Sequence, residues 1–138
     1  MKAASQHAFR FHLDLQSGVP VYRQIIDQIR GAIASGALTT GDQLPTVRQL
    51  AVDLSINPNT VVRAYKELEL SGQLETQQGT GTFISEKKPA GDRAERLRQL
   101  SRITADAVAR AGAAGFTIDQ LVEQLRNWPV RPASKEKP

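Results

Sequence analysis

The stretch from Leu44 to Ser71 constrains the fold of this chain most, because its pattern predicts two short helices with a tight break between them. The first helix is expected over Thr46 to Leu54, where apolar residues recur at the i, i+3, i+4 and i+7 spacing of one buried stripe. Thr46 is a good N-cap, and Gln49 lies three residues on, where it can close a capping box. The stripe consists of Val47, Leu50, Ala51 and Leu54.

The second helix is expected to begin after a break at Ser55 and Ile56. Asn57 can cap it, and Pro58 falls in its first turn, where the missing N–H costs nothing. The helix should run to about Ser71, with Gly72 ending it. Two helices joined by so short a turn form a helix-turn-helix, whose second helix is the one that enters a DNA groove.

The two faces of this second helix differ in chemistry. At 100° per residue, its core face comprises Val61, Ala64, Tyr65 and Leu68. Its other face comprises Asn59, Val62, Arg63 and Lys66. An amide can read adenine, a guanidinium can read guanine, an apolar group can touch the thymine methyl, and a lysine can hold phosphate. Taken alone, the helix fits an ordinary amphipathic helix with a solvated charged face equally well.

A predicted β-hairpin follows directly. Leu74 to Gln77 is typical of a strand, Gln78 to Gly81 of a turn, and Thr82 to Ser85 of a returning strand. A hairpin behind a helix-turn-helix is the wing of a winged helix. Its glycines let backbone N–H groups approach a phosphate or a groove edge, although a plain glycine-rich turn explains the glycines by themselves.

Taken in order, these motifs resemble the N-terminal domain of GntR-type bacterial transcription regulators. The matching positions are Leu44-Pro45-Thr46, Arg48, Leu50-Ala51, Thr60-Val61, Ala64, Leu68, Gly72, Gly79-x-Gly81 and Phe83. The run from Ile56 to Val61, Leu13-Asp14, the segment Ser17 to Pro20 and the short C-terminus resemble the YtrA-like branch of that family. The resemblance covers roughly residues 10–86 in detail.

The resemblance implies a DNA-binding homodimer and a set of contact residues. Those residues are Arg48 in the first helix, Asn57, Asn59, Thr60 and Arg63 at the second, and Thr80 and Gly81 at the wing tip. To these the helix geometry adds Lys66, as a phosphate contact. Many members of the family carry a cation between the wing glycines, where this chain has Thr80.

Composition bounds the remaining classes of function. The chain has 138 residues, enough for one domain or one domain with an appendage, and its net charge is +4. It has no cysteine and no apolar run of membrane-spanning length, and its first residues lack the apolar stretch of a signal peptide, so a cytoplasmic location is expected. Nothing resembles a catalytic set, a metal-ligand cluster or a phosphate loop, so no enzyme activity, metal or cofactor is predicted.

The N-terminal quarter is expected to complete the core of the winged helix. Residues 9–16 alternate apolar and polar side chains, which predicts a half-buried strand or extended arm. Pro20 should start a helix that runs to about Ser35, with an apolar stripe that includes Tyr22 and Ile29 and with Gly36 as its cap. His7 and His12 have no partner at metal-ligand spacing and are expected to be exposed.

A C-terminal two-helix region is predicted after a charged, Pro- and Gly-containing linker at residues 86–91. One helix should run from Asp92 to Ala111 or Ala114, with Arg102–Asp106 and Asp106–Arg110 pairs. A second should start at Ile118, behind a capping box at Thr117. Because two helices alone cannot cover apolar stripes on every side, a homodimer is expected, with folding back onto the winged domain as the alternative. The predicted dimerisation residues are Leu97, Leu100, Val108, Leu121, Leu125 and Trp128.

The sequence therefore predicts a mainly α fold with a small β wing. Residues 9–86 form the winged helix-turn-helix domain, residues 92–128 the dimerisation region and residues 129–138 a disordered tail. The predicted function is sequence-specific transcription regulation, with repression as the expected mode, at a pseudo-palindromic double-stranded DNA operator. The alternative is a winged helix that binds protein only, anchored by Val62 and Leu70. The sequence identifies no small-molecule effector, and a site for one would have to lie between protomers, near Trp128 or the arginine row.

Overall fold

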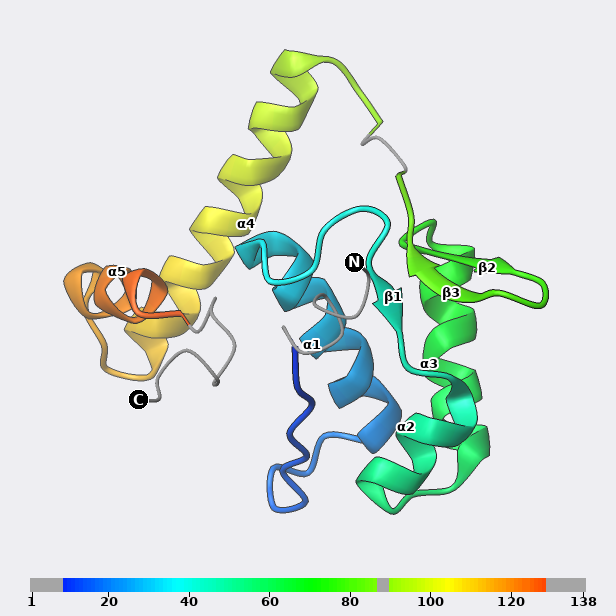
Figure 1. Cartoon of the computed structure of the whole chain (residues 1–138). Helices are drawn as coiled ribbons and strands as arrows, with labels where there is room; N and C mark the ends of the chain where they lie inside the picture. The colour runs from blue at the N-terminus through cyan, green and yellow to red at the C-terminus, as the bar shows by residue number, and fades with distance from the viewer. Residues whose placement is uncertain (1–8, 87–89, 129–138) are drawn as a thin grey trace, which may run out of the picture. The chain divides into compact units, whose positions relative to one another are not determined.

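The computed structural model describes residues 9–86 and 90–128, which form two compact units (Figure 1). The first unit holds three helices and a three-stranded antiparallel sheet, and the second holds two helices. The elements of the first are α1 (Val21–Ser35), β1 (Gln43–Leu44), α2 (Val47–Leu54), α3 (Pro58–Leu70), β2 (Leu74–Gln77) and β3 (Gly81–Ile84). Those of the second are α4 (Arg93–Ala113) and α5 (Ile118–Arg126). The predicted fold class, mainly α with a small β wing, is confirmed.

Helix α1 supplies the centre of the core. It starts after Pro20 and ends at Gly36, which takes the left-handed conformation with φ 86° and donates its N–H to the Ile33 carbonyl. This is the helix that the sequence predicted. Its Ile25, Ile26 and Ile29 are completely buried. Each such side chain stabilises the fold by about 1.5–3 kcal/mol relative to exposure.

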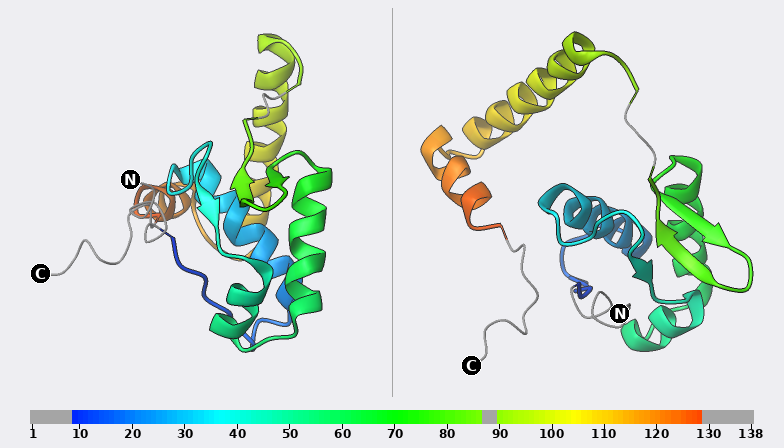
Figure 2. Two further views of the ribbon diagram at one scale, coloured as in Figure 1. Left: turned by 45° about the vertical axis from the view of Figure 1, so that its right-hand side comes forward. Right: turned by 45° about the horizontal axis from the view of Figure 1, so that its top comes forward.

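Helices α1 and α3 lie side by side, as both views of Figure 2 show. Tyr22 in the first turn of α1 contacts Arg63 in the middle of α3, and Arg30 further along α1 donates to Ser71 after the last residue of α3, so the two helices run in the same direction. Helix α2 packs across α3 and closes the predicted three-helix core. The buried residues that α2 and α3 contribute are Leu50, Ala51, Val61, Ala64, Tyr65 and Leu68.

The N-terminal segment is an extended arm, and two glutamines of α1 hold it. The Gln28 amide accepts from the His12 N–H and donates to the His12 carbonyl, at 2.9 and 2.5 Å. The buried Gln24 repeats the pattern at Asp14, at 2.8 and 3.0 Å. These side chains occupy the backbone groups that a neighbouring strand would use, so the arm is extended without belonging to a sheet. The expected alternation ends early, because Leu15 is 77% exposed.

The sheet has the order β1-β3-β2 and contains one strand that the sequence did not predict. Strands β2 and β3 form the predicted hairpin, with Glu75 opposite Phe83. The returning strand begins at Gly81 rather than Thr82. Strand β1 pairs Gln43 with Phe83, where we expected a connecting loop at residues 37–43. A strand of two residues is too short to show an alternating pattern.

The second unit is built from two capped helices. The Asp92 carboxylate accepts the Glu95 N–H at the start of α4, and Thr117 and Gln120 form the predicted capping box of α5. Helix α4 continues through Gly112 to Ala113, and its cap is Ala114, the later of the two predicted ends. Neither helix contains a buried residue.

The predicted ion pairs on α4 are confirmed only in part. Asp106 pairs with Arg110 at 3.9 Å, as expected. Arg102 lies 3.9 Å from the carboxylate of Glu95, and the pairing with Asp106 that we expected is wrong. Because Glu95 also accepts from Arg98 at 2.8 Å, a single carboxylate in the first turn holds two guanidinium groups. Surface pairs of this kind contribute little to stability.

Parts of the prediction fall on residues 1–8, 87–89 and 129–138. His7, the middle of the expected linker and the expected tail lie outside the described residues. No helix among residues 9–86 and 90–128 is both long and apolar enough to cross a membrane.

Candidate nucleic-acid interface

The turn between α2 and α3 is fixed by local hydrogen bonds. The Thr46 hydroxyl accepts the Gln49 N–H at 3.0 Å, which is one half of the predicted capping box at α2. Ser55 ends α2 in the left-handed conformation, with φ 57°. The Ile56 N–H then returns to the Ala51 carbonyl at 3.0 Å. These bonds give the tight break that the sequence predicted.

Helix α3 begins at the predicted residue. The Asn57 side chain accepts the Asn59 N–H at 2.8 Å, and Pro58 occupies the first helical position. The Tyr65 hydroxyl donates to the Pro45 carbonyl at 2.7 Å, and this bond connects α3 to the segment Pro45-Thr46 before α2. Burial raises the pKa of this phenol well above its ordinary value, which further favours the protonated, hydrogen-bond-donating form of Tyr65. This hydrogen bond thereby fixes α3 against the residues that precede α2.

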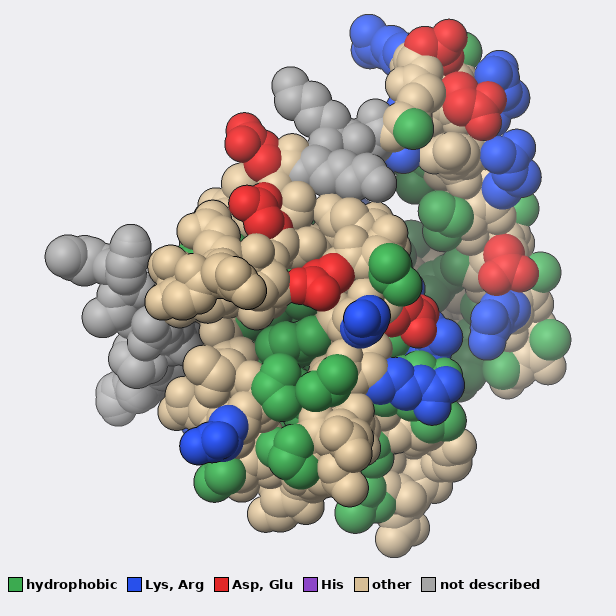
Figure 3. All heavy atoms as spheres, turned by 90° about the vertical axis from the view of Figure 1, so that its right-hand side faces the viewer, with side chains coloured by type: hydrophobic (Ala, Val, Ile, Leu, Met, Phe, Trp, Pro, Cys, Tyr) green, Lys and Arg blue, Asp and Glu red, His purple; other side chains and the backbone are tan. Residues whose placement is uncertain are grey.

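The outer face of α3 carries the side chains that the helix pattern placed there. Asn59, Val62, Arg63 and Lys66 are exposed, and Thr60 is half-buried. Arg48 on α2 is also exposed. Seen from the side of α3 and the wing, the lower part of residues 9–86 shows Lys, Arg and hydrophobic side chains, while acidic ones lie higher (Figure 3). This part of the surface suits an anionic, grooved partner.

The acidic residues near this face have partners. Glu67 lies 3.8 Å from the Arg23 guanidinium of α1. Glu69 accepts from the Thr76 hydroxyl of β2. Their carboxylates are therefore directed toward α1 and the hairpin, and the face of Asn59 and Lys66 keeps its positive sign.

Arg63 stacks on an aromatic ring of α1. Its guanidinium carbon lies 3.7 Å from the centroid of Tyr22. Tyr22 packs against the core, as its place in the predicted apolar stripe of α1 requires, and its half-buried ring also serves as a platform for Arg63. Sequence reasoning missed this contact because the two residues lie on different helices and no spacing rule joins them.

The wing tip presents backbone and a small hydroxyl. Thr80 is exposed, its N–H donates to the Gln77 carbonyl at 2.9 Å, and its own carbonyl accepts from the Gln43 amide at 3.1 Å. Gly79 and Gly81 have φ of 78° and 139°, which favour glycine. The unpredicted strand β1 therefore holds the wing tip through Gln43.

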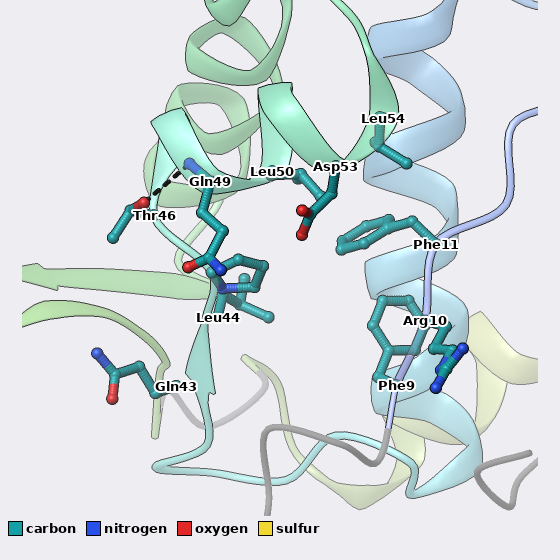
Figure 4. Close-up of a pocket in the computed structure, with 11 residues that line it drawn as sticks. Phe9, Arg10, Phe11, Gln43, Leu44, Thr46, Gln49, Leu50, Asp53 and Leu54 are labelled. Atoms are coloured by element: carbon teal, nitrogen blue, oxygen red, sulfur yellow. Dashed lines mark hydrogen bonds between the residues drawn. The ribbon is translucent and has the colours of Figure 1, made fainter. Parts of the chain in front are cut away.

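A cavity of about 510 Å³ lies between the N-terminal arm and α2 (Figure 4). Its wall combines the edge-to-face pair of Phe9 and Phe11, whose ring centroids are 4.7 Å apart, with polar side chains of α2, among them Gln49 and Asp53. None of the predicted DNA-contacting residues lines it. Within the described residues, no group of three or more His, Asp or Glu side chains could hold a metal ion.

The predicted dimerisation residues separate into two groups. Val108 and Leu121 are half-buried within the two-helix unit. Leu97, Leu100, Leu125 and Trp128 are exposed, as is Ile103, which we did not predict. The second unit thus leaves large apolar side chains in water on both helices.

A helix-turn-helix with a polar and basic outer face, followed by a hairpin wing, defines the class of winged-helix DNA-binding proteins. Residues 21–84 match the family described as bacterial regulatory proteins of the gntR family. The chain belongs to the GntR family of DNA-binding transcription regulators, and its relatives are regulators, not enzymes. The predicted family is thereby confirmed.

Relatives and solved structures match most of the chain. The HTH-type transcriptional repressor YtrA of Bacillus subtilis is 37% identical over 114 residues, which are 83% of this chain and 88% of that protein. The structure of YtrA from Sulfolobus acidocaldarius, described as a GntR-family transcription factor, matches 72% of this chain and 97% of its own, with a TM-score of 0.56 and 34% identity. A transcriptional regulator from Oenococcus oeni matches 83% of this chain and 95% of its own, with a TM-score of 0.55 and 32% identity.

Proposed function

We propose that this chain is a cytoplasmic, homodimeric transcriptional repressor that reads a pseudo-palindromic operator with the outer face of α3. The observation that carries the proposal is the exposed set of Asn59, Val62, Arg63 and Lys66 on a helix whose start is fixed by Asn57. Asn59 and Arg63 read base edges, and Val62 suits a thymine methyl. The name of the B. subtilis relative, a repressor, supports the mode of action.

The remaining predicted residues hold the DNA backbone. Arg48 and Lys66 supply phosphate contacts, and the polar side chains of Asn57 and Thr60 add contacts at the start of α3. At the wing tip, Thr80 and Gly81 bring backbone close to the DNA without a cation. A complex with few cations per protomer needs two protomers to bind tightly and specifically.

The second unit supplies the dimer in this proposal. Leu97, Leu100, Leu125 and Trp128 are exposed on a two-helix unit with no buried residue, and a second copy would cover them. Two recognition helices related by a two-fold axis then read the two halves of the operator. Val108 and Leu121 support the packing of the helix pair beneath that interface. If a small molecule regulates the repressor, the space between the two protomers is where it would bind.

The test uses duplexes that the wild-type protein selects from a random pool, compared with scrambled duplexes of the same composition. Arg63→Ala is expected to relax the preference at one position in each half-site, at a cost of about 1–3 kcal/mol per half-site. Arg10→Ala removes one exposed cation from the arm and is the matched control, with the preference retained. If no sequence is enriched and no duplex is bound, the chain does not act on DNA, and the exposed Val62 and Leu70 favour the protein-binding alternative.

A further inference from the structure

We infer that Tyr22 of α1 is a positioning residue for base reading, because its ring holds the guanidinium of Arg63 in a fixed plane. This inference rests on the proposed function, in which Arg63 contacts a base. The guanidinium carbon is 3.7 Å from the ring centroid, well inside the roughly 6 Å range of a cation–π contact. The ring therefore covers one face of the guanidinium and prevents the long side chain from sampling most of its rotamers.

The platform itself is rigid. Tyr22 lies in the first turn of α1, three and four residues before Ile25 and Ile26, which are completely buried. Helix α1 runs beside α3, so Tyr22 in the first turn of α1 meets Arg63, which lies one turn beyond Asn59 on α3. The Tyr22 ring is thus held against the core of residues 9–86 on one side and contacts Arg63, on the outer face of α3, on the other.

The stack leaves the hydrogen-bonding edge of Arg63 open. Among the described residues, the Arg63 guanidinium has no hydrogen-bond acceptor and no carboxylate partner. A stacked guanidinium uses its face, while its N–H groups lie in the plane and can form a bidentate pair with guanine. The carboxylate of Glu67, one turn further along α3, lies beside Arg23 instead. Arg23 is also the more distant cation on the ring, at 5.8 Å from the Tyr22 centroid.

The inference predicts a specific coupling between two residues on different helices. Tyr22→Leu should lower the discrimination at the base pair read by Arg63 by roughly 3- to 30-fold, the range of one cation–π contact. Discrimination at the other positions should remain as in the wild type. Tyr22→Phe should retain the wild-type preference, because the aromatic face and not the hydroxyl carries the contact.

The experiment is a double-mutant cycle on a duplex selected by the wild-type protein and on the same duplex with one base pair changed. The variants are Tyr22→Leu, Tyr22→Phe, Arg63→Ala and the combination of Tyr22→Leu with Arg63→Ala. If Tyr22 acts through Arg63, the combined variant behaves like Arg63→Ala alone. Circular dichroism shows that each variant is folded, and Tyr22→Met replaces Tyr22→Leu if the latter unfolds.

The outcomes separate this inference from the proposed function. If the wild-type protein selects no duplex, the proposed function itself fails. A second case is that Arg63→Ala loses its base preference while Tyr22→Leu weakens binding to all duplexes equally, both alone and combined with Arg63→Ala. In that case only the role of Tyr22 is wrong. Tighter binding by Tyr22→Leu would likewise overturn the inference, because the ring would then withdraw Arg63 from the DNA.

Discussion

Substitution of Leu100 by alanine should weaken the proposed dimer about a hundredfold. The side chain is 58% exposed on α4, so more than half of it remains for a partner to cover. Leu→Ala removes three methylene-sized groups, each of which contributes about 0.8 kcal/mol when fully buried. Scaled by the exposed fraction, the loss is about 1.4 kcal/mol per protomer. Because a two-fold dimer contains the change twice, the dissociation constant should rise by about two orders of magnitude.

Sedimentation velocity over a concentration series measures this dissociation constant directly. Leu70→Ala is the matched control, since Leu70 is 80% exposed but lies on α3 in the winged unit. It should leave the dimer unchanged. Leu97→Ala, at a similarly exposed position one turn earlier on α4, should weaken the dimer by a comparable factor. Equal dissociation constants for Leu100→Ala and the wild type, or a wild type that stays monomeric at every concentration, would refute the assignment of this face.

Three further substitutions test individual contacts. Tyr65→Phe leaves the Pro45 carbonyl without its donor, so the free energy of unfolding in urea should fall by about 1–2 kcal/mol, and an unchanged midpoint would show that the bond contributes nothing. Lys66→Ala should weaken all duplexes alike and reduce the slope of log affinity against log salt by about 1 per protomer, whereas a change of base preference would contradict a phosphate contact. Thr80→Lys should steepen the same slope, because Thr80 is exposed and its backbone is already held by Gln43 and Gln77, so that a lysine there can reach a phosphate. A slope equal to that of the wild type, in titrations at several salt concentrations, would contradict this phosphate contact.

The helices of this chain could be predicted from its sequence because their ends are fixed by local chemistry. Asn57 followed by Pro58 determines where α3 begins, and Thr117 with Gln120 determines where α5 begins, each through hydrogen bonds within three residues. The end of α4 shows the limit of the same reasoning, because the sequence left it open between Ala111 and Ala114. Gly112 has no left-handed conformation, so α4 passes through it and ends at Ala113, with Ala114 as its cap.

The features that the sequence did not predict all depend on contacts between distant segments. Strand β1 exists because Gln43 and Leu44 pair with Phe83 and Thr82 of the hairpin. The residues around Gln43 do not by themselves predict this pairing. The arm is extended because the side-chain amides of Gln24 and Gln28 bind its backbone. The pattern that predicts helix α1 does not predict which groups these side chains bind. In each case the pairing forms only when segments far apart in the sequence meet in the folded chain.

The stack of Arg63 on Tyr22 belongs to the same class, and it changes how the candidate interface should be understood. From the sequence, the reading face of α3 was a property of α3 alone, set by 100° per residue. In the structure, the guanidinium of Arg63 packs on Tyr22 of α1, a helix that the sequence analysis assigned only to the core. Base preference in this protein should therefore respond to substitutions in α1 as well as in α3, because a long cationic side chain acquires a direction only from the surface against which it packs.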